Sequence, residues 1–384
     1  GSGTTNIAFT GVGKSITVGS AGTQNLNIGG NSGTAAFTTS LVVQANADLT
    51  VNKSFNLSGA FTTTSMLVQP LASLTMGAGT ILTVGTGATL TNNGIFTLQS
   101  NIAGTASIGN LSGTITGNVT VQRYIPGNRR TSRFLGHPFS TALSMASLID
   151  NIFVTGGNYT TGFDSTGTQS PSAYWFDNAS QIWKAFTSTS DASWTQYRGI
   201  RVLVRGDRTQ TTTLTSATPP APNAVTLDMT GTLNTGPQNI TVPTGYSVLG
   251  NPYPSAINAD LFLGYSGNAS LIGGTIYLWT HNTPLTNNIY TTNDYAVYNL
   301  VGGVGTSATN LGVNNTAPTG KIASGQGFFV KALANGNVTF LNSMRVLGNN
   351  NSFFRTNSSA NQDSNGELEK HRLWLNLTNS QGAF

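Results

Sequence analysis

The sequence contains no cysteine and few charged residues. The absence of cysteine excludes disulfide bonds, cysteine-ligated zinc and thiol nucleophiles. It does not exclude secretion, because a chain of 384 residues can bury a sufficient core without disulfides. Only 8% of the residues are charged, against roughly 25% in ordinary globular proteins. This scarcity argues against a helical protein, whose solvated faces need Lys and Glu.

Long apolar runs and basic clusters are also missing. No run of 18 apolar residues occurs, so we expect no transmembrane helix. The net charge of +5 is spread thinly, and before Arg123 the only charged residues are Lys14, Asp48 and Lys53. A nucleic-acid-binding surface needs clustered Lys and Arg, so we expect no nucleic-acid partner.

The N-terminal third is instead rich in Gly, Thr and Asn, with short runs of alternating apolar residues. A Leu-Thr motif recurs at 73–76, 81–84 and 89–91, eight residues apart. Alternation indicates strands, and regular short repeats favour a parallel β-solenoid over residues 1–120. We expect Leu49, Leu74, Leu82 and Leu90 to point inward. The alternative is an ordinary β-sandwich with a Thr-rich face.

The remainder of the chain carries an internal duplication. Four motifs recur in the same order: 134–140 with 248–255, 172–176 with 275–279, 198–202 with 326–330, and 224–227 with 337–340. Each copy is long enough for a sandwich of about seven strands. The sequence therefore predicts an all-β protein with a solenoid-like domain at 1–120, a β-sandwich repeat at 121–235, and a second at 236–384 that includes a C-terminal strand. Pro138 and Pro252 should occupy equivalent turns.

Several of these segments resemble secreted cell-surface proteins of Bacteroidota that use type IX secretion. The resemblance rests on YSVLGNPYPS (246–255), IASGQGFFVKA (322–332), VTVQRYIP (119–126) and YRGIRVLVRG (197–206), and it covers about residues 119–380. It implies a secreted, extracellular or cell-surface location. In such proteins a segment like 372–378 leads into a C-terminal sorting domain. We expect that domain to have been cleaved or to lie outside this sequence.

The Asp and His residues, which often serve as catalytic groups or metal ligands, are better explained here by structural roles. Asp177, Asp191 and Asp207 are the nearest approach to a glycosidase carboxylate pair, but each fits the start of a turn. His137 stands where the second copy has Asn251, which favours a structural hydrogen bond over a metal ligand. We therefore predict no catalytic residue, no metal and no cofactor, and we expect the protein not to be an enzyme.

Two surface features remain as candidates. Trp175, Trp183 and Trp194 would stack on sugar rings if exposed, or form a sandwich core if buried; alternation favours the core. Asp164-Ser165-Thr166 resembles the O-glycosylation sites of Bacteroidota, which makes Ser165 a candidate for modification.

The composition favours a structural surface protein that self-assembles into a filament or a surface layer. Its nearly uncharged surface offers few charges to resist pairing between strand edges. Residues 372–378 alternate as a strand, with Leu373, Leu375 and Leu377 on one face and Trp374 on the other. We expect this strand to cross to a neighbouring subunit; the alternative is that it folds back onto its own second repeat. The alternative functions are a carbohydrate-binding or adhesin module with glycan partners and, third, a glycan-active enzyme.

Overall fold

The protein is all-β, with only three short α-helices among the described residues of the computed structural model. The structure describes residues 16–18, 24–28, 35–37, 41–43, 47–51, 54–57, 60–109, 113–128, 130–280, 294–304, 317–348, 350, 378–379 and 382–383. Side chains are described from Met66 onward, except at 85, 86, 88, 304 and the last four residues of that set.

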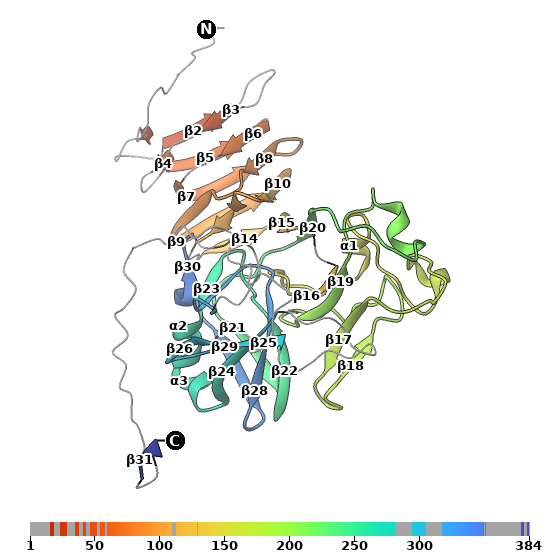
Figure 1. Ribbon diagram of the computed structural model, residues 1–384. Coiled ribbons are helices and arrows are strands. Elements are labelled where there is room, and N and C mark those ends of the chain that lie inside the picture. Colours follow the sequence, from red (N-terminus) through yellow and green to blue (C-terminus); the bar gives the residue numbers. More distant parts are fainter. Residues whose placement is uncertain are drawn as a thin grey trace.

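Parallel strands in two sheets form the N-terminal part, which we call the stack (β1–β14; Figure 1). One sheet has the order β1-β4-β7-β5-β2, and β9 joins it to β13 and β14; the other has the order β3-β6-β8-β10-β15-β20. The strands are β1 (Ile16–Val18), β2 (Gln24–Ile28), β3 (Ala35–Phe37), β4 (Leu41–Val43), β5 (Ala47–Val51), β6 (Ser54–Leu57), β7 (Ala60–Val68), β8 (Ser73–Met76), β9 (Ile81–Asn92), β10 (Ile95–Leu98), β13 (Ser107–Ile108) and β14 (Thr114–Thr116). A short hairpin, β11 (Ser100–Asn101) and β12 (Gly104–Thr105), follows β10.

The Leu-Thr motif runs around the stack. Leu74, Leu82 and Leu90 are all fully buried, as the alternation predicts. Each stacks on a residue much further along the chain, because Leu74 pairs with Phe96, Leu82 with Ile108 and Leu90 with Ile115. The partners are 22, 26 and 25 residues apart (96−74, 108−82 and 115−90). The eight-residue spacing therefore lies within one turn of the stack, with Leu74 on β8 and both Leu82 and Leu90 on β9, and the structural repeat is about three times longer. The side chain of Leu49 lies outside the described residues.

Strand β15 (Val119–Ile125) belongs to the stack and to the first repeat at once. It pairs in parallel with β10 and antiparallel with β20 (Val225–Gly231). One hydrophobic core consequently continues from Leu74 and Phe96 of the stack to Ile200 and Met229 of the first repeat. The boundary predicted at residue 120 falls inside β15 and does not separate two cores.

The two repeats share one strand order. In the first repeat the central sheet has the order β16-β19-β17-β18, and in the second it has the order β22-β28-β24-β25-β26. The first set is β16 (Thr131–Leu135), β17 (Ala173–Asp177), β18 (Ile182–Ala185) and β19 (Ile200–Val204). The second is β22 (Gly245–Gly250), β24 (Ile272–Trp279), β25 (Tyr295–Asn299), β26 (Gly302–Val304) and β28 (Gly327–Ala332). The registers also correspond, because Leu135 pairs with Ile200 as Leu249 pairs with Phe328.

A second layer covers one face of each central sheet. In the first repeat it is the β15–β20 pair, and in the second it is the antiparallel pair of β21 (Gln238–Val242) and β29 (Gly336–Phe340). In the second repeat α2 (Ala259–Gly264) also covers the sheet, and its Phe262 packs on Phe328 and Phe340 in a separate hydrophobic core. The remaining elements are α1 (Ala146–Ile149), α2 (Ala259–Gly264), α3 (Ser266–Ala269), η1 (Tyr159–Thr161), η2 (Thr211–Leu214), η4 (Asn342–Met344), β23 (Ala256–Asn258), β27 (Lys321–Ile322), β30 (Arg345–Val346), β31 (Thr378–Asn379) and β32 (Gly382–Ala383).

The repeats face each other across a local twofold relation. Leu135 bridges to Gln326, and the equivalent residues Leu249 and Arg198 form the same bridge in the opposite sense. The Gly136 N–H donates to Gly325 O (3.0 Å), and the Gly250 N–H donates to Tyr197 O (2.8 Å). A Cβ on Gly136 would lie 2.5 Å from the Cα of Gly250. Glycine is required at this crossing because the two backbones touch.

Candidate functional site

The carboxylates singled out in the sequence are bound within their own turns. Asp191 accepts the Ser193 N–H (2.9 Å), and Asp207 accepts the Thr209 N–H (2.9 Å). Asp177 accepts the Ser180 hydroxyl (2.7 Å) and forms an ion pair with Lys184. Its hydrogen bond with Lys184 is the main cause that lowers the pKa of Asp177 to about 2. These carboxylates carry out the turn role that the sequence indicated.

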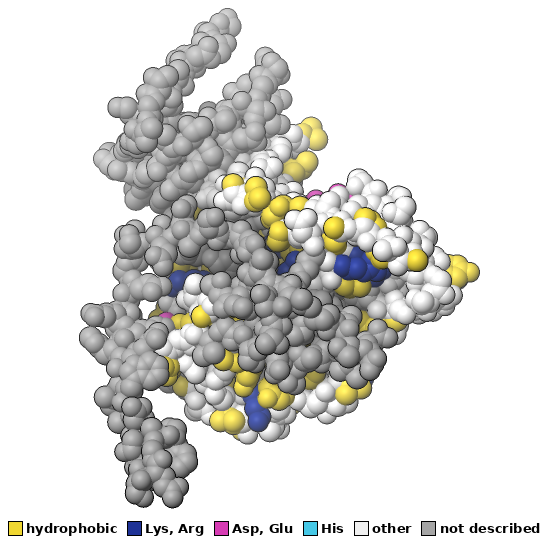
Figure 2. Space-filling view, viewed as in Figure 1, with side chains coloured by type: hydrophobic (Ala, Val, Ile, Leu, Met, Phe, Trp, Pro, Cys, Tyr) yellow, Lys and Arg dark blue, Asp and Glu magenta, His cyan; other side chains and the backbone are white. Residues whose placement is uncertain are grey.

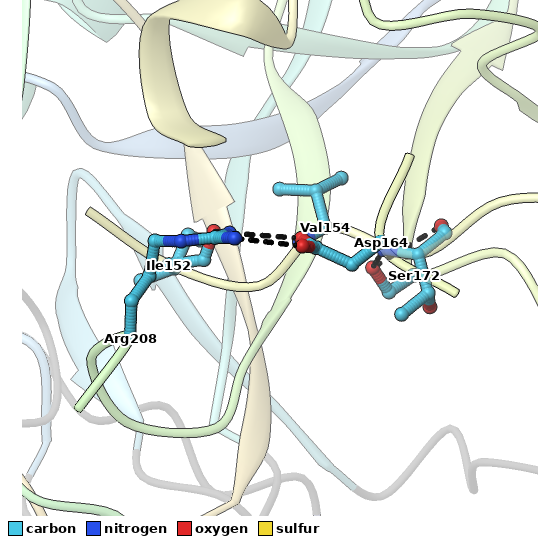
Figure 3. Close-up of polar contacts among 6 residues, drawn as sticks. Ile152, Val154, Asp164, Ser172 and Arg208 are labelled. Atoms are coloured by element: carbon cyan, nitrogen blue, oxygen red, sulfur yellow. Dashed lines mark hydrogen bonds and ion pairs between the residues drawn. The ribbon is translucent and has the colours of Figure 1, made fainter. Parts of the chain in front are cut away.

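Asp164 forms a two-pronged ion pair with Arg208 (Figure 3). The two Arg208 nitrogens donate to Oδ1 and Oδ2 at 2.9 and 3.0 Å, and the Val154 N–H donates to Oδ2 at 2.8 Å. Arg208 also donates to Ile152 O (3.2 Å), so the pair fixes the segment 152–154 to two loops. Ser165, next to Asp164, is exposed. Its hydroxyl is accessible to a modifying enzyme, and its glycosylation stays a prediction.

His137 is a buried structural residue. Its Nδ1 accepts the Phe139 N–H (3.3 Å), and its Nε2 lies 3.3 Å from Trp194 O. Asn251 makes the equivalent bonds in the second repeat: its Oδ1 accepts the Tyr253 N–H (3.0 Å), and its Nδ2 donates to Ile322 O (2.9 Å). Burial lowers the pKa of His137 to about 4, so the ring is neutral at pH 7.

The three candidate tryptophans differ in their exposure: Trp194 is buried, and Trp175 and Trp183 are half-buried. Trp194 is fully buried and its indole N–H donates to Arg198 O (3.1 Å), so the sugar-stacking role is wrong for this residue. The guanidinium of Arg198 lies 4.5 Å from the Trp175 ring centroid, and Lys184 lies 5.5 Å from it. Trp183 packs on the aromatic cluster described next. The core interpretation is confirmed for Trp194, and Trp175 and Trp183 pack against the edges of two hydrophobic clusters.

An aromatic cluster joins the outer faces of the two central sheets. Its buried members are Phe134, Phe176, Val248, Trp279 and Phe329. The rings of Phe134 and Trp279 stack at 5.7 Å, which links the first repeat to the second. Sequence reasoning missed this interface, although the aromatics on both faces of β17 and β24 were a signal that neither face is solvated.

Buried polar side chains clasp the end of the second repeat to the stack. Arg345 donates from Nε to the Ser255 hydroxyl (3.0 Å) and from its guanidinium to Ile108 O in the stack. Asn350 Nδ2 donates to Ala106 O (3.1 Å), and the Asn350 carbonyl accepts from Arg123 (2.7 Å). Burial lowers the pKa of Arg345 to about 9. We call Arg345, Asn350 and Arg123 the clasp. Arg123 lies at one of the buried positions of β15, which otherwise hold apolar residues, and no sequence pattern predicted its burial.

In the predicted assembly strand at 372–378, Leu373, Trp374, Leu375 and Leu377 lie outside the described residues, and Thr378 belongs to β31, which pairs with β32. Within the described ranges no three His, Asp or Glu side chains come together as metal ligands. Likewise, no helix in the described part of the chain has the length and apolarity to cross a membrane.

Neither a curated protein nor a solved structure matches this chain. A family model with the description "Domain of unknown function (DUF8693)" matches residues 55–384, which is most of the sequence. The chain therefore belongs to the DUF8693 family.

Proposed function

We propose that the protein is an extracellular or cell-surface structural protein that self-assembles into a filament or surface layer through strand-mediated contacts between subunits. The observation that carries this proposal is the continuity of the sheet β3-β6-β8-β10-β15-β20, which joins the stack to the first repeat through one core. A sheet whose hydrogen bonds continue from the stack into the first repeat is suited to a mechanical role.

The sparse charge supports self-association. On the face shown in Figure 2, the described Lys and Arg side chains form small, separate patches. Few charges therefore oppose contact between copies. Asp177, Asp191 and Asp207 are engaged in turns, so none of the three carboxylates singled out in the sequence supports the enzyme alternative.

The extracellular location and type IX secretion rest on the resemblance of the motifs at 246–255 and 322–332. The carbohydrate-binding alternative is less well supported, because Trp194 is buried and Trp175 is covered by Arg198.

Sedimentation velocity of the full chain over a hundredfold concentration range tests self-assembly. We expect species larger than the monomer to grow with concentration, and electron microscopy to show filaments or sheets. A monomer at every concentration would contradict the proposal.

A further inference from the structure

The central sheet of the first repeat ends at β18, and no described strand pairs with the outer side of β18. Its counterpart in the second repeat, β25, pairs on its outer side with β26. The backbone at Pro318 lies close against β26, because a Cβ on Gly303 of β26 would lie 2.1 Å from Pro318 O. The two repeats therefore differ at this edge: in the second, β26 covers β25 and the Pro318 backbone lies against β26, whereas no described strand covers β18 in the first.

The side chains of β18 do not protect its edge. Ile182 is 53% exposed. Lysine on an edge strand normally discourages pairing with another chain. Here the Lys184 ammonium is held by Asp177 of the adjacent strand and lies 5.5 Å from the Trp175 ring centroid. Its charge is therefore paired within its own sheet.

Strand β22, at the edge of the central sheet in the second repeat, is protected from strand addition by a side chain. The Tyr246 N–H donates to Gln181 Oε1 (2.7 Å), and Gln181 Nε2 donates to Tyr246 O (2.9 Å). The amide of Gln181 thus takes both backbone bonds that an added strand would make at this residue. The outer edge of β22 is thus covered by the Gln181 side chain and that of β25 by β26, whereas no described element covers the outer edge of β18.

We propose that the outer edge of β18 accepts residues 372–378 of a second copy as an added strand. This assignment rests on the proposed function, for which it names the acceptor. The 21 residues from 351 to 371 separate the end of the clasp from this segment. Fully extended, they span roughly 70 Å, which is enough to reach a neighbouring copy.

The pattern of the segment fits this edge. Leu373, Leu375 and Leu377 share one face, as a strand with one apolar face requires, and they would cover the exposed Ile182. Strand addition supplies affinity through main-chain hydrogen bonds, and a head-to-tail contact of this kind builds a filament when its rotation does not close.

Disulfide trapping tests the contact cleanly, because the chain has no cysteine of its own. Ile182→Cys protein is mixed with an equal amount of Leu373→Cys, Leu375→Cys or Leu377→Cys protein and oxidised with diamide. We expect a cross-linked pair of different variants on a non-reducing gel for at least one mixture. Ile102→Cys, an 83% exposed site on the β11–β12 hairpin, replaces Ile182→Cys as the matched control and should give none.

A second variant separates the acceptor from self-assembly itself. Ile182→Lys places a charge without an ion-pair partner at the edge, and we expect it to lower the association constant measured by sedimentation at least tenfold. Ile102→Lys should leave that constant unchanged. If wild type assembles but Ile182→Lys assembles equally well, or if Ile182→Cys cross-links only to itself, the acceptor is wrong and the proposed function stands. If wild type remains monomeric at every concentration, both are wrong.

Discussion

His137 and Asn251 perform the same structural task with different side chains. Each accepts a backbone N–H two residues ahead and lies within hydrogen-bonding distance of a carbonyl from the facing loop. Only the imidazole can gain a proton, and protonation would remove its acceptor at Nδ1. The two repeats therefore differ in their response to acid through a single pair of equivalent residues.

We expect His137→Asn to reduce the acid sensitivity of the protein. The folded pKa of about 4 lies below the ordinary 6.5, so between these values the unfolded chain binds a proton that the folded chain excludes. The free energy of unfolding therefore falls as the pH drops from 6.5 toward 4, by about 2 kcal/mol between pH 7 and pH 5. Urea unfolding of wild type and variant at both pH values measures this. Equal losses in the two proteins would contradict the buried, neutral imidazole.

Gly136 allows the two repeats to approach at their crossing. Gly136→Ala should destabilise the protein by roughly 1–3 kcal/mol, because its Cβ would lie 2.5 Å from the Gly250 backbone. Gly157→Ala is the matched control, since nothing lies within 4 Å of a Cβ there. Thermal unfolding compares them. A Gly136→Ala protein as stable as the control would show that the crossing is looser than the structure has it.

At the scale of elements, the sequence predicted most of what local pattern can determine. Alternation placed Leu74, Leu82 and Leu90 inside, and the ordered motifs predicted matching strand orders in the two halves. The length of one turn of the stack could not be read from an eight-residue motif, because the pairing of Leu74 with Phe96 depends on how the chain turns between strands. The burial of Arg123 could not be predicted for a similar reason, since its partner Asn350 lies 227 residues away in the sequence.

The inward leucines of the stack can be tested with a charge. Leu82→Asp buries a carboxylate in the core and should cost roughly 2–5 kcal/mol in unfolding free energy. Ile102→Asp, the same kind of change at an 83% exposed site, should cost little. Chemical denaturation followed by circular dichroism gives both values. An unchanged unfolding midpoint for Leu82→Asp would count against the stacked arrangement.

On the scale of the whole molecule, the structure has two principal cores where the sequence predicted three domains. The first core unites the stack with the first repeat through β15, and the second lies within the second repeat. The aromatic cluster and the clasp connect them, with Arg345 of the second repeat bonded to Ile108 of the stack. The three predicted segments at 1–120, 121–235 and 236–384 should therefore not unfold as three units.

We expect Trp279→Ala to separate the unfolding of the second repeat from that of the rest. The Trp279 ring stacks on Phe134 of the first repeat, so its loss weakens the contact between the two cores while leaving each core in place. Hydrogen exchange in increasing denaturant should then show amides of the second repeat losing protection first, and amides of β8, β10 and β19 losing it together later. Tyr159→Ala removes an aromatic ring that is 55% exposed and should leave the order of exchange as in wild type. If β8 and β10 instead lose protection independently of β19, the stack is a separate cooperative unit and the continuity through β15 does not couple it to the first repeat.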